Sequence, residues 1–208
     1  MKRAKLLKLI KDRLSGKRLL HSRSTAIICE RMAEILGEDP ENAFTAGLLH
    51  DIAKPYSNKE LLQKAKKYKI MIDYPTSRQL SLLHAPVGAA MIRDTFGLKD
   101  EVIFEAVANH TTGNAGISNL SLIVYAADFL DPARAFPKQG KAWVIMDKDF
   151  YEGILYIARF TMKRVLGHWQ FLHPFTVALY NEMHEKTSDK GRARFPLQGV
   201  NRNIRLEN

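Results

Sequence analysis

The chain has 208 residues, a length that suits one large domain, or one domain with a small appendage. Its formal net charge of +10 is concentrated at the two ends: residues 1–23 carry nine Lys and Arg against one Asp, and residues 186–208 carry six against two acids. The rest of the chain therefore has no basic excess, which argues against a nucleic-acid-binding body. We expect the basic ends to be solvated, with RNA contact through them as the less favoured alternative.

The number of cysteines and the length of the apolar runs indicate the cellular compartment of the protein. Cys29 is the only cysteine, so an intrachain disulfide is excluded and a reducing compartment is favoured. We expect its thiol to be a small buried group. At the N-terminus, Lys8 and Lys11 interrupt each apolar run before it reaches signal-peptide length. No stretch approaches the apolar length of a membrane span. The sequence therefore predicts a cytoplasmic protein that does not enter a membrane.

Helical periodicity recurs along the chain, and no alternating strand pattern or internal repeat is present. The sequence therefore predicts an all-α fold, a single bundle of about eight helices. The first is a short basic helix that Ser15-Gly16 ends, and its apolar face is formed by Leu6, Leu7, Ile10 and Leu14. We expect this face to pack on the body.

Capping residues place the next two helices. His21 stands directly before a helix that Ser22 or Ser24 can cap and that Gly37 closes. An Asp-Pro pair at 39–40 then begins a helix that ends near His50.

The later helices are less sharply bounded. Pro75 and its polar neighbours predict a loop over 71–79. Pro86 either begins the following helix or kinks it just after His84. Asp147 and Asp149 are expected at a solvated helix start. The boundary around 131–146 is poorly defined, and further helices are predicted over 58–69, 81–97, 99–110, 118–130, 147–166 and 175–185.

Six polar residues stand out from apolar or helical surroundings. An Asp such as Asp128, in "LIVYAADFL", is costly to bury by several kcal/mol unless it is paired or coordinated. His and Asp suit divalent first-row metals, and helical bundles bring such ligands together from several helices. Each His alone fits a structural role better, but together they predict one metal-dependent hydrolytic site. The six are His21, His50, Asp51, His84, His110 and Asp128. His168, His173 and His184 lack a partner acid and are expected to be structural or surface residues.

Candidate phosphate-binding residues flank these ligands. Lys54 could bind phosphate as a point charge, or it could be a solvated cation at a helix end. Arg134 could bind phosphate through its planar fork, or it could pair with Asp131. A glycine after His110 would let backbone N–H groups approach a phosphate, although the signal is weak alone. The candidate residues after His110 are Thr111, Thr112 and Gly113.

The order His21, His50-Asp51, Asp128 resembles that of the HD-domain metal-dependent phosphohydrolase superfamily, and His84 and His110 match the additional histidines of its dinuclear members. The strings "AGLLHDIAK", "LLHAPVGA", "ANHTTG" and "YAADFLDPAR" resemble the YqeK-type subgroup, the bacterial symmetrical diadenosine tetraphosphate hydrolases. The resemblance runs from about His21 to Asn181. It implies an HD domain over 21–185, with a basic N-terminal helix over 1–20 and a basic tail over 186–208.

This resemblance implies a catalytic site with two divalent metals. One would be held by His21, His50, Asp51 and Asp128, and Asp51 would bridge to the second. His84 and His110 would hold that second metal. Iron is expected from the family, while Mn, Co and Ni fit the same ligands. A metal-activated hydroxide would then split diadenosine tetraphosphate into two ADP. Besides the metal ligands, Lys54 and Arg134 would assist catalysis by stabilising the charge of the departing ADP.

Two positions depart from the subgroup: Ser121 stands where an acid is expected, and Ala85 replaces a glycine after His84. Neither removes a ligand. Two other functions stay open. The chain could be a related hydrolase acting on another nucleotide or on a phosphate monoester. It could also be a nucleotide- or RNA-binding module with a structural metal, although an open double-metal centre argues against that. A homodimer is also left open.

Overall fold

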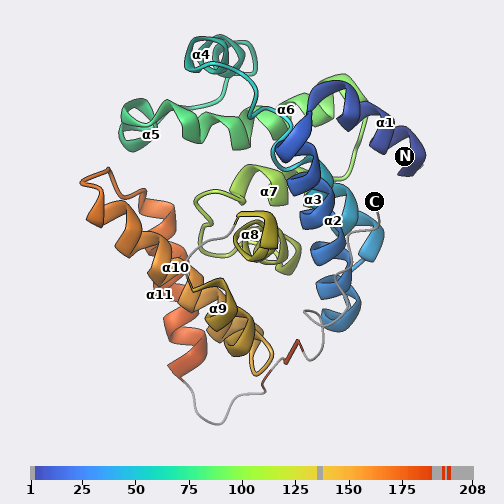
Figure 1. The fold of residues 1–208 in the computed structure, drawn as a ribbon. Helices are drawn as coiled ribbons and strands as arrows, with labels where there is room; N and C mark the ends of the chain where they lie inside the picture. The colour runs from blue at the N-terminus through green and yellow to red at the C-terminus, as the bar shows by residue number, and fades with distance from the viewer. Residues whose placement is uncertain (1–2, 135–137, 189–193, 195, 198–208) are drawn as a thin grey trace.

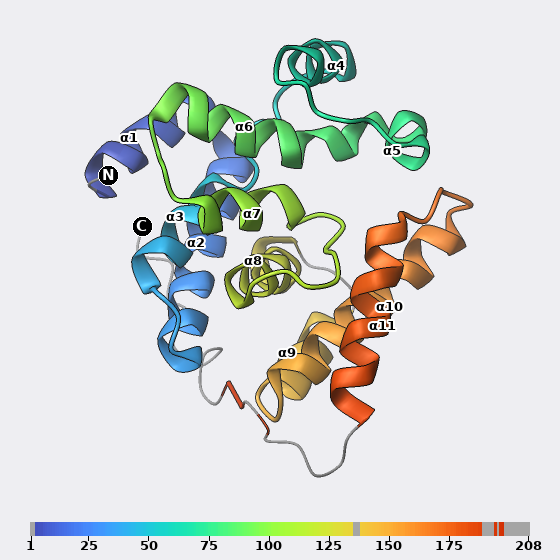
Figure 2. The ribbon, with the colours of Figure 1, turned by 180° about the vertical axis from the view of Figure 1, so that it is seen from behind.

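The computed structural model describes residues 3–134, 138–188, 194, 196 and 197, and in these residues it contains helices and turns but no strand (Figures 1 and 2). The predicted all-α class is confirmed. The expected number of about eight helices is too low, because the described residues form eleven α-helices and two short 3-10 helices. They are α1 (Arg3–Arg13), α2 (Gly16–Leu36), α3 (Pro40–Leu49), α4 (Asn58–Lys67), α5 (Tyr74–Arg78), η1 (Leu80–Leu83), α6 (His84–Phe96), α7 (Glu101–Asn109), α8 (Asn119–Leu130), η2 (Pro132–Arg134), α9 (Gln139–Met146), α10 (Phe150–Gly167) and α11 (Pro174–Ser188).

Helix α8 lies at the centre of the molecule (Figures 1 and 2). Helices α2 and α3 lie on one side of it, α7 lies next to it, and α9, α10 and α11 lie on the other side. The sequence explains this position, since a helix that is apolar on every face is stable only when it is enclosed. Ten of the twelve residues of α8 are buried, from Leu120 to Leu130. Asp128 near its C-terminal end is thereby held inside the fold.

Helix α2 begins earlier than the sequence indicated. It starts at Gly16, and its N-cap is Ser15, which has extended φ and ψ angles of −132° and 163°. The expectation that Ser22 or Ser24 caps the helix is therefore wrong: both are buried in its second and third turns. His21 consequently projects from inside a helix, which fixes the direction of its ring more firmly than a position before the helix would.

Two short helices were not foreseen. Residues 71–79, predicted as a loop, contain α5, because Asp73 caps it by accepting a hydrogen bond from the backbone N–H of Thr76. The poorly defined region around 131–146 contains α9, whose Trp143 and Met146 are buried. Both helices are short, and α9 depends on long-range packing of its apolar residues, which local periodicity does not reveal.

Several other boundaries hold with small shifts. Gly37 ends α2 in the left-handed conformation at φ 72°, and Asp39 caps α3 as predicted. Pro86 lies in the first turn of α6, so it begins this helix and does not kink it. The helix predicted over 147–166 is α10, which starts three residues later. Its N-cap, Asp149, is fully buried and not solvated.

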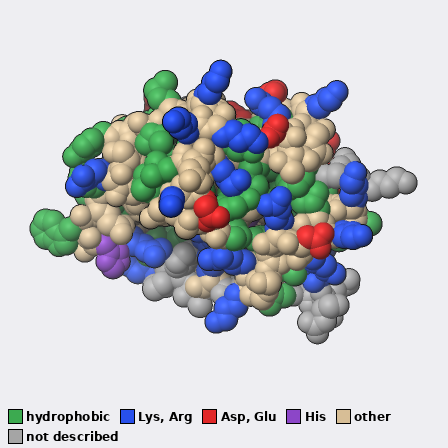
Figure 3. Space-filling view, turned by 90° about the horizontal axis from the view of Figure 1, so that it is seen from above, with side chains coloured by type: hydrophobic (Ala, Val, Ile, Leu, Met, Phe, Trp, Pro, Cys, Tyr) green, Lys and Arg blue, Asp and Glu red, His purple; other side chains and the backbone are tan. Residues whose placement is uncertain are grey.

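The N-terminal helix α1 packs on the body through Leu6 and Ile10, as expected from its apolar face. Lys and Arg side chains are spread over the face seen in Figure 3 and are not gathered into one stripe. Most of the tail over 186–208 lies outside the described residues, but Leu197 is buried and its N–H donates to the carbonyl of Met146. The division of the chain at residues 20 and 185 stays a prediction. None of the helices in the described part of the chain combines the length and apolar character needed to cross a membrane.

Candidate active site

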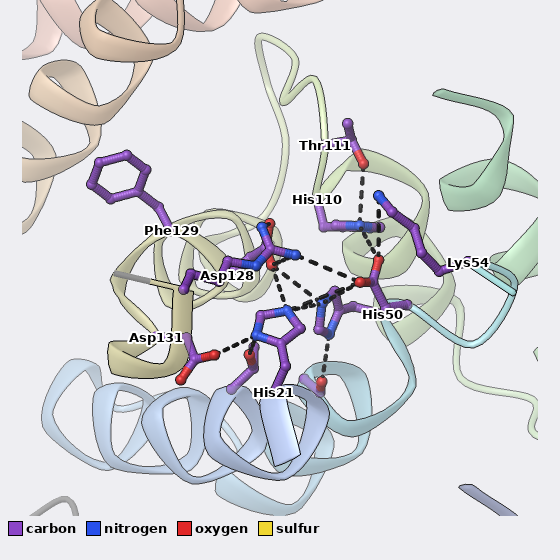
Figure 4. Close-up of polar contacts among 12 residues, drawn as sticks. His21, His50, Lys54, His110, Thr111, Asp128, Phe129 and Asp131 are labelled. Atoms are coloured by element: carbon purple, nitrogen blue, oxygen red, sulfur yellow. Dashed lines mark hydrogen bonds and ion pairs between the residues drawn. The ribbon is translucent and has the colours of Figure 1, made fainter. Parts of the chain in front are cut away.

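Five helices, α2, α3, α6, α7 and α8, bring the predicted ligands to one point. Figure 4 shows four of them: His21, His50, His110 and Asp128. His50 ends α3 and Asp51 follows it, His84 begins α6, and His110 ends α7. His21 reaches the same point from α2 because α2 packs on both α3 and α8. The structure therefore brings together all six residues that the sequence singled out.

Three of the histidines are oriented in the same way. Nδ1 of His50 lies 2.7 Å from the carbonyl of Gly47, Nδ1 of His84 lies 2.5 Å from that of Ser81, and Nδ1 of His110 lies 2.8 Å from that of Val107. Carbonyls near a helix end lack an intrahelical partner, so they accept a hydrogen bond from the Nδ1–H three residues later. Each Nε2 is then left without a proton and with its lone pair exposed, which is the tautomer of a metal ligand.

These Nε2 atoms point at one another. His21 and His50 have their Nε2 atoms 3.1 Å apart, and His84 and His110 do too. In the second pair both Nδ1 atoms donate to carbonyls, so neither Nε2 carries the proton that a hydrogen bond between them would need. Facing lone pairs repel each other, and a cation between them would remove that repulsion. The donor set therefore fits divalent metal binding.

Each carboxylate oxygen of Asp51 faces a different pair of histidines. Oδ1 lies 3.2 Å from Nε2 of His84 and 3.5 Å from Nε2 of His110. Oδ2 lies 3.7 Å from Nε2 of His50 and 4.0 Å from Nε2 of His21. Asp51 is thus shared by two groups of potential ligands, His21–His50–Asp51 and Asp51–His84–His110. Its Oδ1 is buried and has no hydrogen-bond partner among the described residues, a costly arrangement that a bound cation would relieve.

Asp128 completes the first group. Its Oδ1 lies 2.9 Å from Nε2 of His21 and 3.3 Å from Nε2 of His50. Arg134 contacts the same carboxylate with both terminal nitrogens, each at 2.9 Å, and its Nη2 lies 3.6 Å from Oδ2 of Asp51. Arg134 therefore forms a fork on Asp128, a contact that neither sequence alternative had included.

The charges of the site follow from burial and neighbouring groups. Burial alone would raise the pKa of Asp51, but the neighbouring histidines, His50 first and then His110 and His84, outweigh it and hold that pKa well below its usual range. For Asp128 burial is likewise outweighed, by the charge of Arg134 and the hydrogen bond from His21, and its pKa is also well below normal. Both acids are therefore anionic at neutral pH.

The pKa values of the histidines shift in different directions. Burial lowers the pKa of His84 and of His110, so both rings are neutral and available as ligands at neutral pH. Burial also acts to lower the pKa of His21, but hydrogen bonds to Asp128 and Asp131 outweigh it and raise that pKa to about 9. Without a metal, His21 therefore holds a proton that a metal has to displace.

Sequence reasoning missed the role of Asp131. Its side chain is fully buried, and its Oδ2 lies 2.5 Å from Nδ1 of His21 (Figure 4). A carboxylate on the far nitrogen of a ligand histidine fixes its orientation and raises its basicity. The spacing of three residues from Asp128 was a signal for this role, but Asp131 had been considered only as a partner of Arg134.

A cavity of about 440 Å³ opens beside the second ligand group. Lys54, whose Nζ lies 3.2 Å from Nε2 of His84, lines it. Thr111 also lines it, with its hydroxyl 3.1 Å from Nε2 of His110, and Thr112 does too. Gly113 does not line this cavity. It adopts φ +63°, its N–H donates to the carbonyl of Asn109, and a Cβ there would approach Leu179 to 2.3 Å.

The far wall of the cavity comes from α10, α11 and the turn between them, which the sequence had not connected with the site. His168 and His173 line it. The expectation that His173 lacks a partner acid is wrong, because its Nε2 lies 2.9 Å from Oδ2 of Asp73. This pair joins the α10–α11 turn to α5.

Two further sequence expectations concern packing. Cys29 is fully buried, as predicted. Ser121, which stands where an acid was expected, is also buried, and its hydroxyl donates to Glu105 at 3.1 Å. An acidic group is thus supplied at this place by a neighbouring helix.

Comparisons with known proteins agree with this geometry. Residues 18–133 match the HD domain family. The symmetrical bis(5'-nucleosyl)-tetraphosphatase of Bacillus subtilis is 30% identical over 87% of this chain and 97% of its own length. The protein of the same name from Halalkalibacterium halodurans is 31% identical over 88% of this chain and 97% of its own length.

A crystal structure of a Clostridium acetobutylicum protein, described as a predicted HD superfamily hydrolase involved in NAD metabolism, has the same fold. Its TM-score is 0.85 at 28% sequence identity, and the match covers 90% of this chain and 99% of that chain. The extent of these matches, together with six converging His and Asp side chains, shows that this chain belongs to the HD domain family of hydrolases.

Proposed function

We propose that this chain hydrolyses diadenosine tetraphosphate symmetrically and releases two ADP. The observation that carries the proposal is Asp51, whose two oxygens face two separate histidine pairs beside a cavity of about 440 Å³. Relatives that align over nearly their whole length are named symmetrical bis(5'-nucleosyl)-tetraphosphatases, which supports this choice of substrate.

Two divalent cations fit the donor atoms. His21, His50 and Asp128 would hold one ion with Oδ2 of Asp51, and His84 and His110 would hold the other with Oδ1. We assign iron as the metal, with Mn, Co and Ni compatible with the same nitrogen and oxygen ligands. When bound, such a pair of ions lowers the pKa of water and neutralises charge on a phosphoryl group.

The reaction adds one water to one of the two inner phosphorus atoms. The bond from this phosphorus to the central bridging oxygen breaks, so that each half leaves with two phosphates. Because Asp51 belongs to both ligand groups, the attacked phosphorus would lie next to the cations that this carboxylate would help to hold. Since the leaving oxygen belongs to a phosphate, stabilising its charge matters more than giving it a proton.

Lys54 and Arg134 are suited to that stabilisation. Lys54 Nζ lies 3.9 Å from Oδ1 of Asp51, and Arg134 Nη2 lies 3.6 Å from Oδ2, so a cation stands on each side of the bridging carboxylate. Arg134 can offer a fork to phosphate oxygens and Lys54 a point charge. Thr111 and Thr112 line the cavity next to His110 and are placed to hydrogen-bond a phosphate that enters it.

Product analysis tests the proposal. The metal-loaded protein is incubated with diadenosine tetraphosphate, and the nucleotides are separated by ion-exchange chromatography. ADP is expected as the only product, whereas AMP with ATP would contradict symmetrical cleavage. Asp51→Asn is expected to abolish turnover. Asp94→Asn removes an exposed acid that pairs with Lys67 and belongs neither to the ligand groups nor to the cavity lining, so it serves as the control that keeps turnover.

A further inference from the structure

A second cavity reaches the ligand cluster from another side. It measures about 480 Å³, and its lining includes His21, Asp51 and three residues at the start of α2: Lys17, Arg18 and Leu20. The first cavity is lined by His84, His110 and Asp128 instead. Lys54 and Arg134 line both cavities. The ligand cluster is therefore accessible from two cavities, which share the cationic side chains of Lys54 and Arg134.

The second cavity attracts anions. Lys17 and Arg18 are exposed, and neither forms an ion pair or hydrogen bond with a residue that the structure describes. They precede His21 by four and three residues, so all three lie on one side of α2, about one turn apart. Among the residues that line this cavity, the one acid is Asp51, which is already surrounded by histidines.

The helix end beneath these cations adds to the effect. The first turn of α2 contains no acidic residue, and the hydroxyl of its N-cap Ser15 accepts no capping hydrogen bond. The N–H groups of a helix start carry partial positive charge and bind phosphate well. Two cations at this end are unfavourable by themselves, and an anion in the cavity would offset that.

The two cavities differ in character. The first includes the aromatic side chains Phe129, Phe160 and Phe171, which can contact a nucleobase. The second offers four cationic side chains and one aliphatic side chain, Leu20, which is 52% exposed. The second cavity is therefore better suited to a chain of phosphates than to an enclosed base.

We propose that the second cavity binds one nucleoside diphosphate half of the substrate, with Lys17 and Arg18 in contact with its phosphates. This inference rests on the proposed function, because symmetrical cleavage implies two equal nucleoside diphosphate halves, one on each side of the central bridging oxygen. Cavities of about 440 and 480 Å³ that adjoin at the cluster provide similar room for both halves. The first half lies along α10 and α11, and the second lies along the start of α2.

The test compares two double variants of the full chain. Lys17→Gln/Arg18→Gln removes the cations of the cavity. Lys5→Gln/Lys8→Gln removes two exposed charges of the same sign from α1, which line neither of the two cavities. Because all four side chains are on the surface, both variants should fold, and thermal melting followed by circular dichroism checks this. Metal content is measured to show that the cluster is intact.

Two readouts are used. The first is the number of ADP molecules bound to the metal-loaded protein, measured by isothermal titration calorimetry. Wild type and the control are expected to bind two, and Lys17→Gln/Arg18→Gln is expected to bind one. The second is steady-state hydrolysis of diadenosine tetraphosphate. The cavity variant should raise KM by roughly ten- to a hundredfold through the loss of charge-assisted contacts, and change kcat much less.

The outcomes separate the two proposals. A wild-type protein that binds a single ADP, or a cavity variant that matches the control in both readouts, would overturn the second site. If wild type does not hydrolyse diadenosine tetraphosphate, the proposed function fails. ADP binding then still decides the second site: two molecules with one lost in the cavity variant support it, and a single molecule refutes it.

Discussion

Oδ2 of Asp131 lies 2.5 Å from Nδ1 of His21, while Nε2 of the same ring lies 2.9 Å from Oδ1 of Asp128 (Figure 4). The ring is therefore held between two carboxylates, one that orients it and one that shares the proposed metal with it. A carboxylate in the orienting position fixes which nitrogen keeps its proton. Asp131 thus orients His21, the ligand that α2 contributes. It contacts Nδ1, on the opposite side of the ring from the Nε2 that would bind the metal.

Replacing Asp131 with Asn should weaken metal binding and leave the fold intact. The amide is nearly isosteric but cannot stabilise the histidine as a carboxylate does, so metal affinity should fall by roughly ten- to a hundredfold. Chelator competition measures the affinity, and excess metal should restore turnover. Asp100→Asn at the half-buried N-cap of α7 is the control, because asparagine also caps helices. Unchanged affinity in the Asp131 variant would show that His21 needs no orienting acid.

The metal-free protein should lose stability as pH rises from 6.5 to above 9. Hydrogen bonds to Asp128 and Asp131 outweigh burial and raise the pKa of His21 to about 9, above its unfolded value near 6.5. A raised pKa stabilises the fold fully below the unfolded value, and this contribution disappears as pH passes the folded value. The loss is up to about 3 kcal/mol.

Urea unfolding of chelator-treated protein at pH 6.5 and pH 9.5 measures this loss. In the His21→Gln variant, stability should change much less over the same interval, because the titrating group is gone. If the free energy of unfolding fell by the same amount in both proteins between these two pH values, the assignment of the proton to His21 would be contradicted.

Gly47 is required for the close contact between α2 and α3. A Cβ at this position would lie 2.8 Å from Sγ of Cys29 and 2.9 Å from Cα of Ala26. Gly47→Ala should therefore destabilise the protein by roughly 1–3 kcal/mol, as over-packing of a core does. Because the carbonyl of Gly47 also orients His50, metal affinity should fall too.

The matched control is Gly140→Ala in α9, where a Cβ would meet nothing within 4 Å. In denaturant unfolding, the free energy of unfolding of this variant should equal or slightly exceed that of wild type, since alanine has a higher helix propensity than glycine. If Gly47→Ala were as stable as Gly140→Ala, the α2–α3 contact would not be as tight as the distances indicate.

The sequence alone predicted which His and Asp residues come together in the fold, but not the residues that orient them. His50, Asp51 and Asp128 could be located because each is a polar residue next to a buried apolar run, which is a local property. The contact between Asp131 and His21 spans 110 positions, and no local pattern shows it. The same holds for His173, whose partner Asp73 caps α5, a segment that its proline and polar residues had led us to predict as a loop.

The helix boundaries, too, were predicted correctly only where they depend on local interactions. Caps such as Asp39 and Gly37 were predicted correctly because their interactions are made within a few residues. The start of α2 was missed because Ser22 and Ser24, good capping residues by type, are buried inside the helix. As a result Lys17 and Arg18 were counted as part of a solvated basic end, whereas the structure places them beside the ligand cluster.

Asp51 is proposed to join two metal ions. The most direct test is the metal content per chain, measured by inductively coupled plasma mass spectrometry after loading and desalting, for wild type, His84→Ala and Asp51→Asn. The bridging role of Asp51 predicts two ions in wild type and one in His84→Ala, because His21, His50 and Asp128 still hold the first. Asp51→Asn is expected to weaken both sites at once. A single ion in wild type, or two ions retained in Asp51→Asn, would contradict it.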